Sequence, residues 1–222
     1  RLPGQAPEIM TITPHNAPEF FTEEHAEFVM QLAETRDAVV LGCGMGVHSQ
    51  TAGFVQQLTK HLDGPLLIDA DGLNNLDKET LKERLGIAVI TPHPRELSRL
   101  SGKSITEIQE TRIDTVRRLS QEWNVVLLLK GAFTVIGNPD GRIFINPTGN
   151  SALSTAGSGD VLSGFIGAFL AQGLSPLYAT LTGAFLHGLA ADCFVEKNDS
   201  SYMVASDLFD GLLLARNSIK IH

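Results

Sequence analysis

The sequence predicts an α/β fold with a mainly parallel central sheet flanked by helices. Short apolar runs alternate along the chain with amphipathic helical patterns, which is the order expected of strand–helix–strand units. Glycine loops, acidic residues, His93 and Lys130 follow directly after the apolar runs. Ligand sites of open α/β sheets gather at the carboxyl ends of the strands. Because we see no internal repeat, low-complexity tract or linker, we expect one domain over residues 1–222 with a site at that edge.

Composition limits the classes of function. The chain has 222 residues, 43% hydrophobic and 19% charged, which fits one domain with a full-sized core. Its net charge of -8 argues against a broad nucleic-acid surface, although backbone amides could still form a local phosphate site. Two cysteines make no disulfide framework and indicate a reducing compartment. The sequence shows no signal-peptide pattern and no apolar run long enough to span a bilayer. It opens at Arg1 rather than Met, as a fragment or a processed chain would.

The first third of the chain is expected to hold two helices and a strand. Residues 1–21 are rich in proline and are interpreted as an extended stretch. Thr22 is an N-cap residue followed by two acids, and the apolar residues after it recur at the spacing of an amphipathic helix. These apolar residues are Ala26, Val29, Met30 and Ala33. Residues 38–41 form a short apolar strand, and Ser49 is expected to cap a second helix that runs to about His61.

A glycine loop at residues 42–46 connects that strand to that helix. Strand, glycine loop and helix are the order expected at the carboxyl edge of a parallel sheet. The loop reads Gly-x-Gly-x-Gly and so departs from the dinucleotide-binding spacing Gly-x-Gly-x-x-Gly. We therefore assign no Rossmann site, and we interpret Cys43 within the loop as a small packed thiol rather than a nucleophile.

Two further strands end in polar residues. Residues 65–68 are followed by Asp69 and Asp71. Acids in this position are often functional, but capping of the following helix is the preferred interpretation for at least one of them. Residues 87–90 lead to His93, which lies between two prolines and so has a restricted backbone. We do not assign His93 to a metal, because no second His or Cys lies at ligand spacing.

The middle of the chain predicts a helix, a buried strand and a hairpin. Ser104 and Glu107 form a capping box, and the helix that they open is expected to run to about Trp123. Its inward side chains are expected to be Ile108, Ile113, Val116 and Leu119. Residues 125–129 are continuously apolar, as in a central parallel strand, and end at Lys130. Residues 133–136 and 142–145 flank an Asn-Pro-Asp-Gly sequence, which is a hairpin signal.

The most informative stretch is residues 150–173, which is small and polar in its first half and apolar in its second. We interpret it as a loop that leads into a helix beginning near residues 157–160, with Gly173 just after its end. A helix N-terminus has unpaired N–H groups and binds anions, and glycines let the backbone approach a phosphate closely. Asp160 then lies where a carboxylate could meet both a phosphate and a hydroxyl. The alternative is an acid that only complements the helix dipole.

The chain closes with two predicted helices. Ser175 and Pro176 are the N-cap and first residue of a helix that runs to about Cys193. His187 lies on this helix, where a role in the core or in solvent is the preferred interpretation. Ser206 is expected to cap the last helix, over residues 207–217.

Five motifs, in their order along the chain, resemble those of one enzyme family. They are Leu41-Gly-Cys-Gly-Met-Gly46, Asp69-Ala-Asp-Gly-Leu-Asn74, Thr91-Pro-His-Pro-Arg-Glu96, Leu129-Lys-Gly-Ala132 and Thr155-Ala-Gly-Ser-Gly-Asp-Val-Leu-Ser-Gly164. Over almost its whole length the chain resembles the ADP/ATP-dependent NAD(P)H-hydrate dehydratases of the ribokinase-like superfamily. The resemblance implies a ribokinase-like fold and the dehydration of the S epimer of NADH or NADPH hydrate, with hydrolysis of ATP or ADP. The implied chemistry is a kinase step on a ring hydroxyl followed by loss of phosphate.

The resemblance also implies a site for each substrate. Asp160 is implied as the catalytic base and as a contact of the hydrate. The other implied hydrate-binding residues are Gly46, His93, Pro94, Arg95, Glu96, Leu97, Ser98 and Arg99. The implied ADP or ATP site consists of Lys130, Gly131, Ala132, Phe133, Thr134, Asn150, Ser151, Ala152, Leu153, Ser154, Thr155, Ala156, Gly157, Ser158 and Gly159. Mg²⁺ is implied as a bridge between phosphates, held mostly by water and substrate oxygens, and no protein metal ligand is directly assigned.

Partners and alternatives complete the expectation. The resemblance implies an NAD(P)H-hydrate epimerase as functional partner and a cytoplasmic homo-oligomer, with a tetramer as one option; no nucleic-acid or membrane partner is expected. Relative to the family, the chain is expected to lack an N-terminal segment. Two alternatives stay open: a vitamin-precursor kinase of the hydroxyethylthiazole or hydroxymethylpyrimidine type, and a truncated nucleotide-binding scaffold without activity. The Thr91-Pro-His-Pro segment favours the dehydratase.

Overall fold

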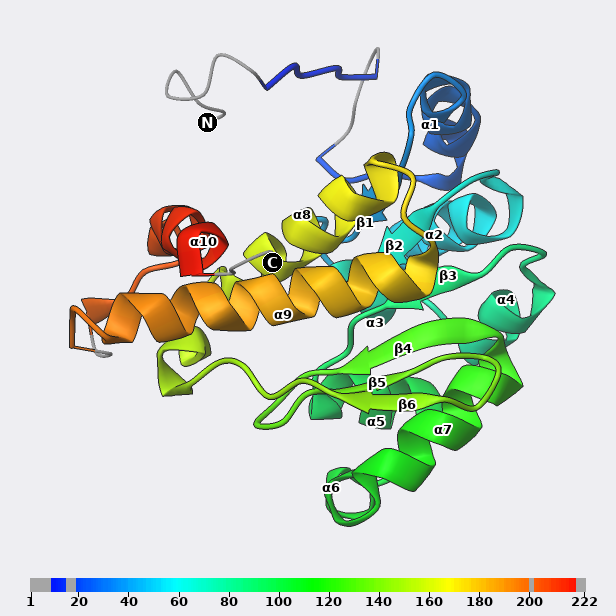
Figure 1. The fold of residues 1–222 in the computed structure, drawn as a ribbon. Coiled ribbons are helices and arrows are strands. Elements are labelled where there is room, and N and C mark those ends of the chain that lie inside the picture. Colours follow the sequence, from blue (N-terminus) through cyan, green and yellow to red (C-terminus); the bar gives the residue numbers. More distant parts are fainter. Residues whose placement is uncertain (1–8, 15–18, 200–201, 219–222) are drawn as a thin grey trace.

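Six strands form one central sheet in the computed structural model, which describes residues 9–14, 19–199 and 202–218 (Figure 1). Their order across the sheet follows their order along the chain. The strands are β1 Val39–Leu41, β2 Leu66–Ile68, β3 Ala88–Ile90, β4 Val125–Leu129, β5 Val135–Gly137 and β6 Ile143–Ile145. The first four are parallel, and the last two are added antiparallel. The predicted mainly parallel sheet is therefore confirmed. Of the extended stretch predicted over residues 1–21, residues 1–8 and 15–18 lie outside the described residues.

Alternate residues of the strands pack into two different cores. Ile68, Ile90 and Leu127 belong to the core on one face of the sheet. Their neighbours Leu67, Val89, Val126 and Leu128 belong to the core on the other face. Successive side chains of a strand point to opposite faces, so a strand buried on both faces must be apolar throughout. This is why the central strands read as continuous apolar runs.

Helices cover both faces of the sheet. The helical segments before β4 are η1 Glu23–His25, α1 Ala26–Ala33, α2 Ser49–His61, α3 Asp71–Asn74, α4 Lys78–Glu83, α5 Pro94–Ser101, α6 Ile105–Glu110 and α7 Arg112–Trp123. Those after β6 are η2 Ser151–Ser154, α8 Ser158–Ala171, α9 Pro176–Val195 and α10 Asp207–Ser218. Side chains of α2, α5 and α7 fill the first core, and side chains of α8 and α9 fill the second. Figure 1 shows α9 crossing the sheet beside α8, with α10 against its far end.

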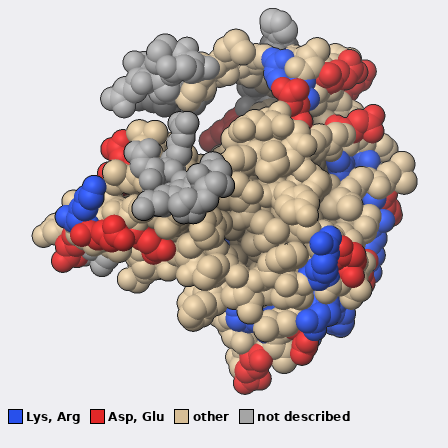
Figure 2. Space-filling model, in the orientation of Figure 1, with Lys and Arg blue, Asp and Glu red and all other residues tan. Residues whose placement is uncertain are grey.

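The surface over α9 carries little charge. The helix has no Lys, Arg, Asp or Glu from its first residue to Ala191. Figure 2 shows this face of the molecule, with acidic and basic side chains gathered towards its edges and a mostly uncharged middle. Within the described part of the chain, no helix combines the length and the apolarity needed to cross a bilayer.

Two predicted helix boundaries were wrong. The helix predicted between Ser104 and Trp123 is broken at Thr111, whose φ of -127° and ψ of 38° leave the helical region. The Thr111 hydroxyl donates to the Glu107 carbonyl oxygen at 2.8 Å and ends α6 there. Ile113, expected to face inward, is consequently 41% exposed. Ser49 does not cap α2, because His48 takes the cap position and its Nδ1 accepts from Gln50 N at 3.2 Å.

The remaining elements agree with the sequence patterns. Gly141 turns the predicted hairpin with φ of 87° and donates to the Asn138 carbonyl at 2.9 Å. The helix α8 begins at Ser158, directly after Gly157 in the left-handed region, and Gly173 follows its end with φ of 87°. Ser175 and Pro176 open α9 as predicted. The helix extends two residues beyond Cys193.

Candidate active site

The carboxyl ends of four strands bring the polar motifs together. The backbone N–H of Asp69, after β2, donates to the carbonyl of Leu41, at the end of β1. In the same way, Lys130 N after β4 donates at 2.9 Å to the Pro92 carbonyl after β3. Parallel pairing therefore continues for a residue or two past the strands and sets the glycine loop, the two acids, the His93 segment and Lys130 along one edge.

An ion pair between Lys130 and Asp69 lies at the centre of this edge. Lys130 Nζ donates to Asp69 Oδ1 at 2.6 Å. Asp69 Oδ2 accepts from the hydroxyl of Ser163, on α8, at 2.7 Å. The Asp69 side chain is 1% exposed and the Lys130 side chain 20% exposed. Asp69 therefore joins β2, β4 and α8 through its two oxygens, and it is not the helix cap that was one interpretation of this acid.

The first turn of α8 faces Lys130. A Cβ atom placed on Gly159 would stand 3.6 Å from Lys130 Nζ, so the absence of a side chain leaves the ammonium open towards the helix N-terminus. Asp160 lies in the same turn and is exposed. The helix N-terminus, the ammonium and the carboxylate thus meet at one place. This combination can bind an anion and hold a proton acceptor beside it.

Cys43, in the glycine loop, contacts Asp160. Burial, a hydrogen bond to Asp160 and the negative charge of that side chain together raise the pKa of the Cys43 thiol to about 12. A thiol with such a pKa remains protonated at neutral pH and is a poor nucleophile. The expectation that Cys43 is not a nucleophile agrees with this pKa, but the residue is exposed rather than packed.

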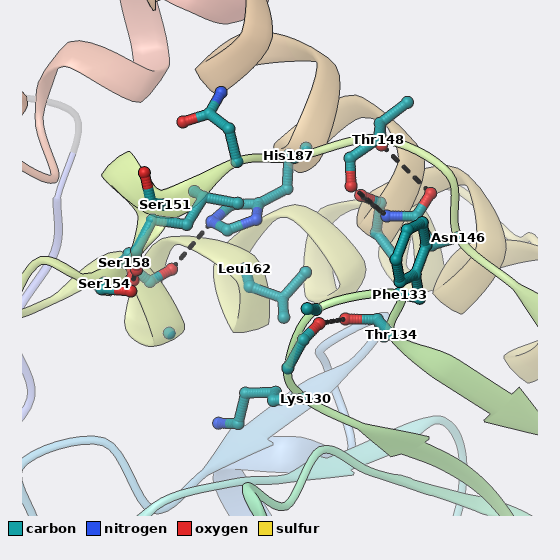
Figure 3. Close-up of a pocket in the computed structure, with 18 of the residues that line it drawn as sticks. Lys130, Phe133, Thr134, Asn146, Thr148, Ser151, Ser154, Ser158, Leu162 and His187 are labelled. Atoms are coloured by element: carbon teal, nitrogen blue, oxygen red, sulfur yellow. Dashed lines mark hydrogen bonds between the residues drawn. The ribbon is translucent and has the colours of Figure 1, made fainter. Parts of the chain in front are cut away.

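A cavity of about 490 Å³ opens beside Lys130 (Figure 3). Its lining includes all five residues from Lys130 to Thr134. Of the second stretch expected at the nucleotide, it includes Asn150, Ser151, Leu153, Ser154, Ser158 and Gly159. Ala152 is buried beneath the loop in a core with α9 and α10, and residues 155–157 stand outside the lining. The two stretches, 16 positions apart in sequence at their closest, thus share one cavity.

Residues that the sequence did not assign to a substrate complete this cavity. They are Asn146, Pro147, Thr148, Gly149, Leu162, Ala184, His187 and Gly188. Residues 146–149 connect β6 to η2, and the last three lie on α9. Figure 3 shows Lys130 and His187 on opposite sides of the cavity, coming from the sheet and from α9. Apart from the position of Pro147 and Gly149 in a turn-forming run, the sequence offers no signal for these residues.

The helix α9 holds the loop that forms the cavity wall. Asp192 accepts from Gly149 N at 2.9 Å and from Asn150 Nδ2 at 2.8 Å. Thr148 Oγ1 donates to the carbonyl of Phe185 at 2.9 Å, and Asn146 Nδ2 donates to that of Ala184 at 3.1 Å. Four hydrogen bonds within five residues fix the loop on the helix.

His187 is part of that wall. It is 7% exposed, and its Nε2 donates to the carbonyl oxygen of Ser158, at the start of α8, over 2.9 Å. Burial lowers the pKa of His187 to about 4; the bond to Ser158 opposes this shift and the charge of Lys130 adds to it. The ring is therefore neutral at physiological pH and serves as a hydrogen-bond donor to α8. His187 is buried, as a core role requires, but it also lines the cavity.

The residues expected at the hydrate divide into two groups. His93 caps α5: its Nδ1 accepts from Glu96 N at 3.1 Å, while Glu96 Oε2 accepts from His93 N at 2.8 Å. The His93 side chain remains 47% exposed. Burial raises the pKa of the Glu96 carboxyl, while the His93 N–H and the Lys130 charge oppose that rise. Pro94 is the first residue of α5, and Arg95 is exposed beside it.

The second group turns away from the strand ends. Leu97 is fully buried in the core under the sheet. The Ser98 hydroxyl donates to the carbonyl of Lys103 at 2.6 Å. Arg99 donates to the carbonyls of Leu73 and, at 3.0 Å, Leu76, and so ties α5 to the segment after β2. Gly46, by contrast, lies with His93 at the edge, exposed and with φ of 79°.

The site contains acidic groups without forming a ready set of metal ligands. Asp69 and Asp160 lie close enough to Cys43 for their negative charges to raise the pKa of its thiol. Glu96 lies close enough to Lys130 for the ammonium to oppose the rise in the pKa of the Glu96 carboxyl group. Within residues 9–14, 19–199 and 202–218, no three His, Cys, Asp or Glu side chains are arranged to hold a metal ion together.

Comparison with known proteins gives close matches. A protein-family model described as NAD(P)H-hydrate dehydratase matches residues 4–213. The chain is 41% identical to the ADP-dependent (S)-NAD(P)H-hydrate dehydratase of Neisseria meningitidis over 184 residues, which cover 80% of this chain and 62% of that enzyme. It is 42% identical to a bifunctional NAD(P)H-hydrate repair enzyme of Moorella thermoacetica over 209 residues, which cover 92% of this chain and 39% of that enzyme. The chain thus spans about two fifths of the bifunctional relative.

Solved structures agree with the sequence matches. The ADP/ATP-dependent NAD(P)H-hydrate dehydratase of Bacillus subtilis, co-crystallised with ATP and Mg²⁺, superposes with a TM-score of 0.76 at 30% identity, covering 85% of this chain and 70% of that one. A ribokinase-like superfamily protein of Enterococcus faecalis superposes with a TM-score of 0.72 at 24% identity, covering 88% and 68%, which shows the fold. The fold is therefore ribokinase-like, and the chain belongs to the NAD(P)H-hydrate dehydratase family.

Proposed function

We propose that the chain catalyses the ADP- or ATP-dependent dehydration of (6S)-NAD(P)H hydrate to NAD(P)H, releasing phosphate and AMP or ADP. One observation carries this proposal: Asp160 stands in the first turn of α8, next to Gly159, which faces the Lys130 ammonium. Phosphoryl transfer needs a held phosphate, neutralised charge and an acceptor for the proton of the attacking hydroxyl. The names of the Neisseria and Bacillus relatives supply the substrate class.

The cavity beside Lys130 fits the adenine nucleotide. Its volume of about 490 Å³ lies in the usual range of small-ligand sites, roughly 300–1,000 Å³. An ammonium has three N–H donors, and Asp69 takes one of those of Lys130, which leaves two for phosphate oxygens. Phe133 lines the cavity, is 73% exposed and has a positive φ of 53°, so its ring is presented at the mouth where an adenine could stack. Eleven of the fifteen residues expected from sequence at the nucleotide line this space, and Ala152 and residues 155–157 do not.

The hydrate is proposed to lie on the other side of Asp160, between Gly46 and His93. Both are exposed at the same sheet edge. The Glu96 backbone N–H donates to the His93 imidazole, and the Glu96 carboxylate accepts from the His93 backbone N–H. Leu97, Ser98 and Arg99 lie behind this surface and support it. Leu97 packs in the core, the Ser98 hydroxyl donates to the Lys103 carbonyl, and Arg99 donates to the Leu76 carbonyl after α3. In this arrangement the ring hydroxyl of the hydrate reaches Asp160 and the terminal phosphoryl group together.

The chemical step then follows from the residues in place. The hydroxyl oxygen of the hydrate attacks the terminal phosphorus of the nucleotide, and Asp160 accepts the hydroxyl proton. The bond between the terminal phosphorus and the rest of the nucleotide breaks. The N–H groups of the α8 first turn and Lys130 hold the charge on the transferring group. The C–O bond of the phosphate ester then breaks and releases inorganic phosphate, while the adjacent ring carbon loses a proton to solvent. The C=C double bond formed between these two carbons gives the reduced nicotinamide.

Mg²⁺ fits the charge of this site. Asp69, Glu96 and Asp160 bring three carboxyl groups to an edge whose central cation is Lys130, and oxygen is the donor that Mg²⁺ prefers. Bound with the nucleotide, the ion would neutralise the phosphate oxygens. The carboxylates would hold it mainly through water, since they do not converge as direct ligands.

The cellular setting is proposed from the relatives. Relatives named as bifunctional repair enzymes support an NAD(P)H-hydrate epimerase as the partner that supplies the S epimer. The acidic composition and the cysteine usage favour a cytoplasmic enzyme without a nucleic-acid partner. The uncharged face over α9 favours a homo-oligomer.

The test is an assay of phosphate release from NADH hydrate with ADP or ATP, comparing the wild type with Asp160→Asn. If Asp160 is the base, its substitution should lower turnover by about 10²–10⁴-fold, while nucleotide affinity is retained. As a charge that only favours the helix dipole, it should cost about 1 kcal/mol of stability and leave turnover intact. Near-normal turnover in a folded Asp160→Asn variant would refute the catalytic role.

The same assay separates the dehydratase from a kinase. A dehydratase restores the absorbance of the reduced nicotinamide and releases one inorganic phosphate for each molecule formed. A vitamin-precursor kinase would instead leave a stable phosphorylated product of a thiazole or pyrimidine alcohol and would not respond to the hydrate.

A further inference from the structure

The glycine loop between β1 and α2 is bound to α3 through both peptide groups of Gly46. Gly46 N donates to Asp71 Oδ2 at 2.9 Å, and the Gly46 carbonyl accepts from Asn75 Nδ2 at 2.8 Å. Two residues later, His48 N donates to Asn75 Oδ1 at 3.3 Å. Gly46 itself has φ of 79° and no atom within 4 Å of where its Cβ would stand. The loop has an open outer side, and the position of Gly46 is set by these bonds.

Asn75 is built for this contact. It is 5% exposed, and its side-chain amide is fully used: the second donor of Nδ2 goes to the Asp71 carbonyl at 2.8 Å. A buried amide with all its partners in place is rigid, and losing one partner is costly. Asn75 therefore links the loop to α3 rather than filling space.

Asp71 does not behave as an ordinary helix cap. The helix α3 has four residues and a correspondingly small dipole, and the Asp71 side chain reaches a backbone N–H 25 positions earlier in the chain. Ala70, just before it, has φ of 49° and ψ of -124°, a conformation that L-residues rarely adopt. This turn aims Asp69 at Lys130 and Asp71 at Gly46. Backbone strain of this kind persists where the surrounding structure requires it, and often at functional sites.

The two segments are also in direct backbone contact. A Cβ on Gly42 would collide with the Asp69 carbonyl oxygen, and a Cβ on Gly72 would stand 2.7 Å from the Leu41 carbonyl oxygen. The glycine loop can therefore lie on α3 only because both positions lack a side chain.

We propose that Asp71 and Asn75 are positioning residues that hold Gly46 in place for the nicotinamide-hydrate substrate. The inference rests on the proposed function, and it assigns to the Asp69–Asn75 segment a part in each half of the site. Asp69 orients Lys130 on the nucleotide side, and Asp71 with Asn75 orients the glycine loop on the hydrate side. Neither Asp71 nor Asn75 touches the reacting atoms, so they act through Gly46.

The first experiment compares Asp71→Ala, Asp71→Asn and Asn75→Ala with the wild type in steady-state assays of NADH hydrate with ADP or ATP. Displacing a substrate-binding backbone by about 1 Å can cost up to about 10² in rate. We expect the KM for the hydrate to rise about tenfold or more in Asp71→Ala and Asn75→Ala, with the KM for the nucleotide unchanged. Asp71→Asn should recover most of the loss, because an amide oxygen can still accept from Gly46 N.

Asp77→Ala is the matched control. Asp77 belongs to the same segment, and its Oδ1 accepts from Thr80 N at 2.7 Å as the cap of α4, without contacting the glycine loop. Its loss should lower the melting temperature and leave both KM values unchanged. This control separates general destabilisation from a displaced loop.

A second readout does not depend on activity. Cys43 lies in the same loop and is exposed, whereas Cys193 is buried, so iodoacetamide labelling of Cys43 reports the loop position. Release of the loop should free the thiol from Asp160 and raise its labelling rate in Asp71→Ala about tenfold for each unit by which its pKa falls. Asp77→Ala should label as the wild type does.

The outcomes are distinct. A folded Asp71→Ala variant with the wild-type KM for the hydrate overturns the positioning role, whatever its labelling rate. If Cys43 is labelled at the wild-type rate in both Asp71→Ala and Asn75→Ala, these two residues do not hold the glycine loop in place. A wild type without hydrate-dependent phosphate release overturns the proposed function, and the inference falls with it.

Discussion

At the scale of single residues, the ion pair of Asp69 and Lys130 combines a structural role with the phosphate contact that we propose for Lys130. The carboxylate is almost fully buried, and its charge is compensated by one ammonium at 2.6 Å and one hydroxyl at 2.7 Å. A buried charge that loses its partner is strongly destabilising, whereas a neutral pair in the same place need not be. The two roles can therefore be separated by substituting one residue or both.

Lys130→Met is expected to reduce stability and nucleotide binding together. Loss of the ammonium leaves Asp69 buried without its cation and should lower the free energy of unfolding by about 3 kcal/mol. The double variant Asp69→Asn with Lys130→Met should recover most of this stability, because the amide still accepts from Ser163. Nucleotide affinity should remain lost in both. Urea unfolding and nucleotide titration measure the two effects, and affinity that returns with stability would contradict a phosphate role for Lys130.

His187 is expected to make stability depend on pH. Burial lowers its pKa from 6.5 to about 4, so between these values the unfolded chain binds a proton at His187 and the folded chain does not. The stability that this residue contributes is therefore complete above pH 6.5 and is lost as the pH falls towards 4, by about 3 kcal/mol in all. His187→Gln keeps a donor for the Ser158 carbonyl and does not titrate.

The measurement is the free energy of unfolding of the wild type and of His187→Gln at a series of pH values from 7 to 4. Other carboxyl groups titrate in both proteins, so the difference between the two curves isolates His187. Parallel curves would show that the imidazole is not held neutral.

At the scale of elements, α9 shapes the cavity beside Lys130 through Gly188. A Cβ at this position would collide with Thr148 Oγ1 and would stand 2.6 Å from the Thr148 carbonyl carbon. Gly188→Ala should therefore push the loop at residues 146–150 away from α9, lowering the free energy of unfolding by about 1–3 kcal/mol. Nucleotide affinity should fall about tenfold or more, because that loop lines the cavity. Isothermal titration with ADP or ATP measures the second effect.

Gly164→Ala is the matched control for this helix substitution. Gly164 lies exposed within α8, and nothing stands within 4 Å of a Cβ placed on it. Alanine should raise stability there by about 0.5–1 kcal/mol through helix propensity and leave nucleotide affinity unchanged. If Gly188→Ala binds nucleotide as tightly as Gly164→Ala does, the contact with Thr148 does not shape the cavity.

The strands and most helices could be predicted because their signals are local. A few neighbouring residues are enough to predict each of three features: the apolar strand β4, the cap at Ser104 and the start of α9 at Pro176. The break at Thr111 has no glycine or proline to mark it. Arg112, at the start of α7, instead donates to the carbonyls of Leu129 and Lys130, so tertiary contacts with the end of β4 accompany the break. Such a contact joins residues 17 positions apart and leaves no local pattern.

At the scale of the whole molecule, one half of the site was predictable and the other half was not. Motifs at the strand ends could be assigned to one edge, because parallel strands place their carboxyl ends together. His187 reaches the cavity from α9, which approaches from the other side, and Asp192 on the same helix holds the loop after β6. Both roles depend on how α9 packs on that loop. Asp71 and Asn75 are similar, since their partner in the glycine loop lies more than 20 positions away.

Ligand-linked stability tests the whole arrangement. A ligand that binds the folded state alone stabilises it by about 2.7 kcal/mol at a concentration of 100 times its dissociation constant. For a chain of 222 residues this corresponds to a rise in melting temperature of roughly 5–11 °C. We expect this rise in the wild type with ADP or ATP and Mg²⁺, and the nucleotide with the larger shift at equal concentration is the one that binds more tightly.

The double variant Asp69→Asn with Lys130→Met provides the reference for this measurement. It is expected to keep the fold and to lose the phosphate contact, so its melting temperature should not respond to either nucleotide. The opposite wall of the cavity, which is the loop bonded to α9, does not depend on Lys130 and remains in place. A full nucleotide shift in this variant would therefore assign binding to the α9 side of the cavity alone, and would remove Lys130 from the phosphate site.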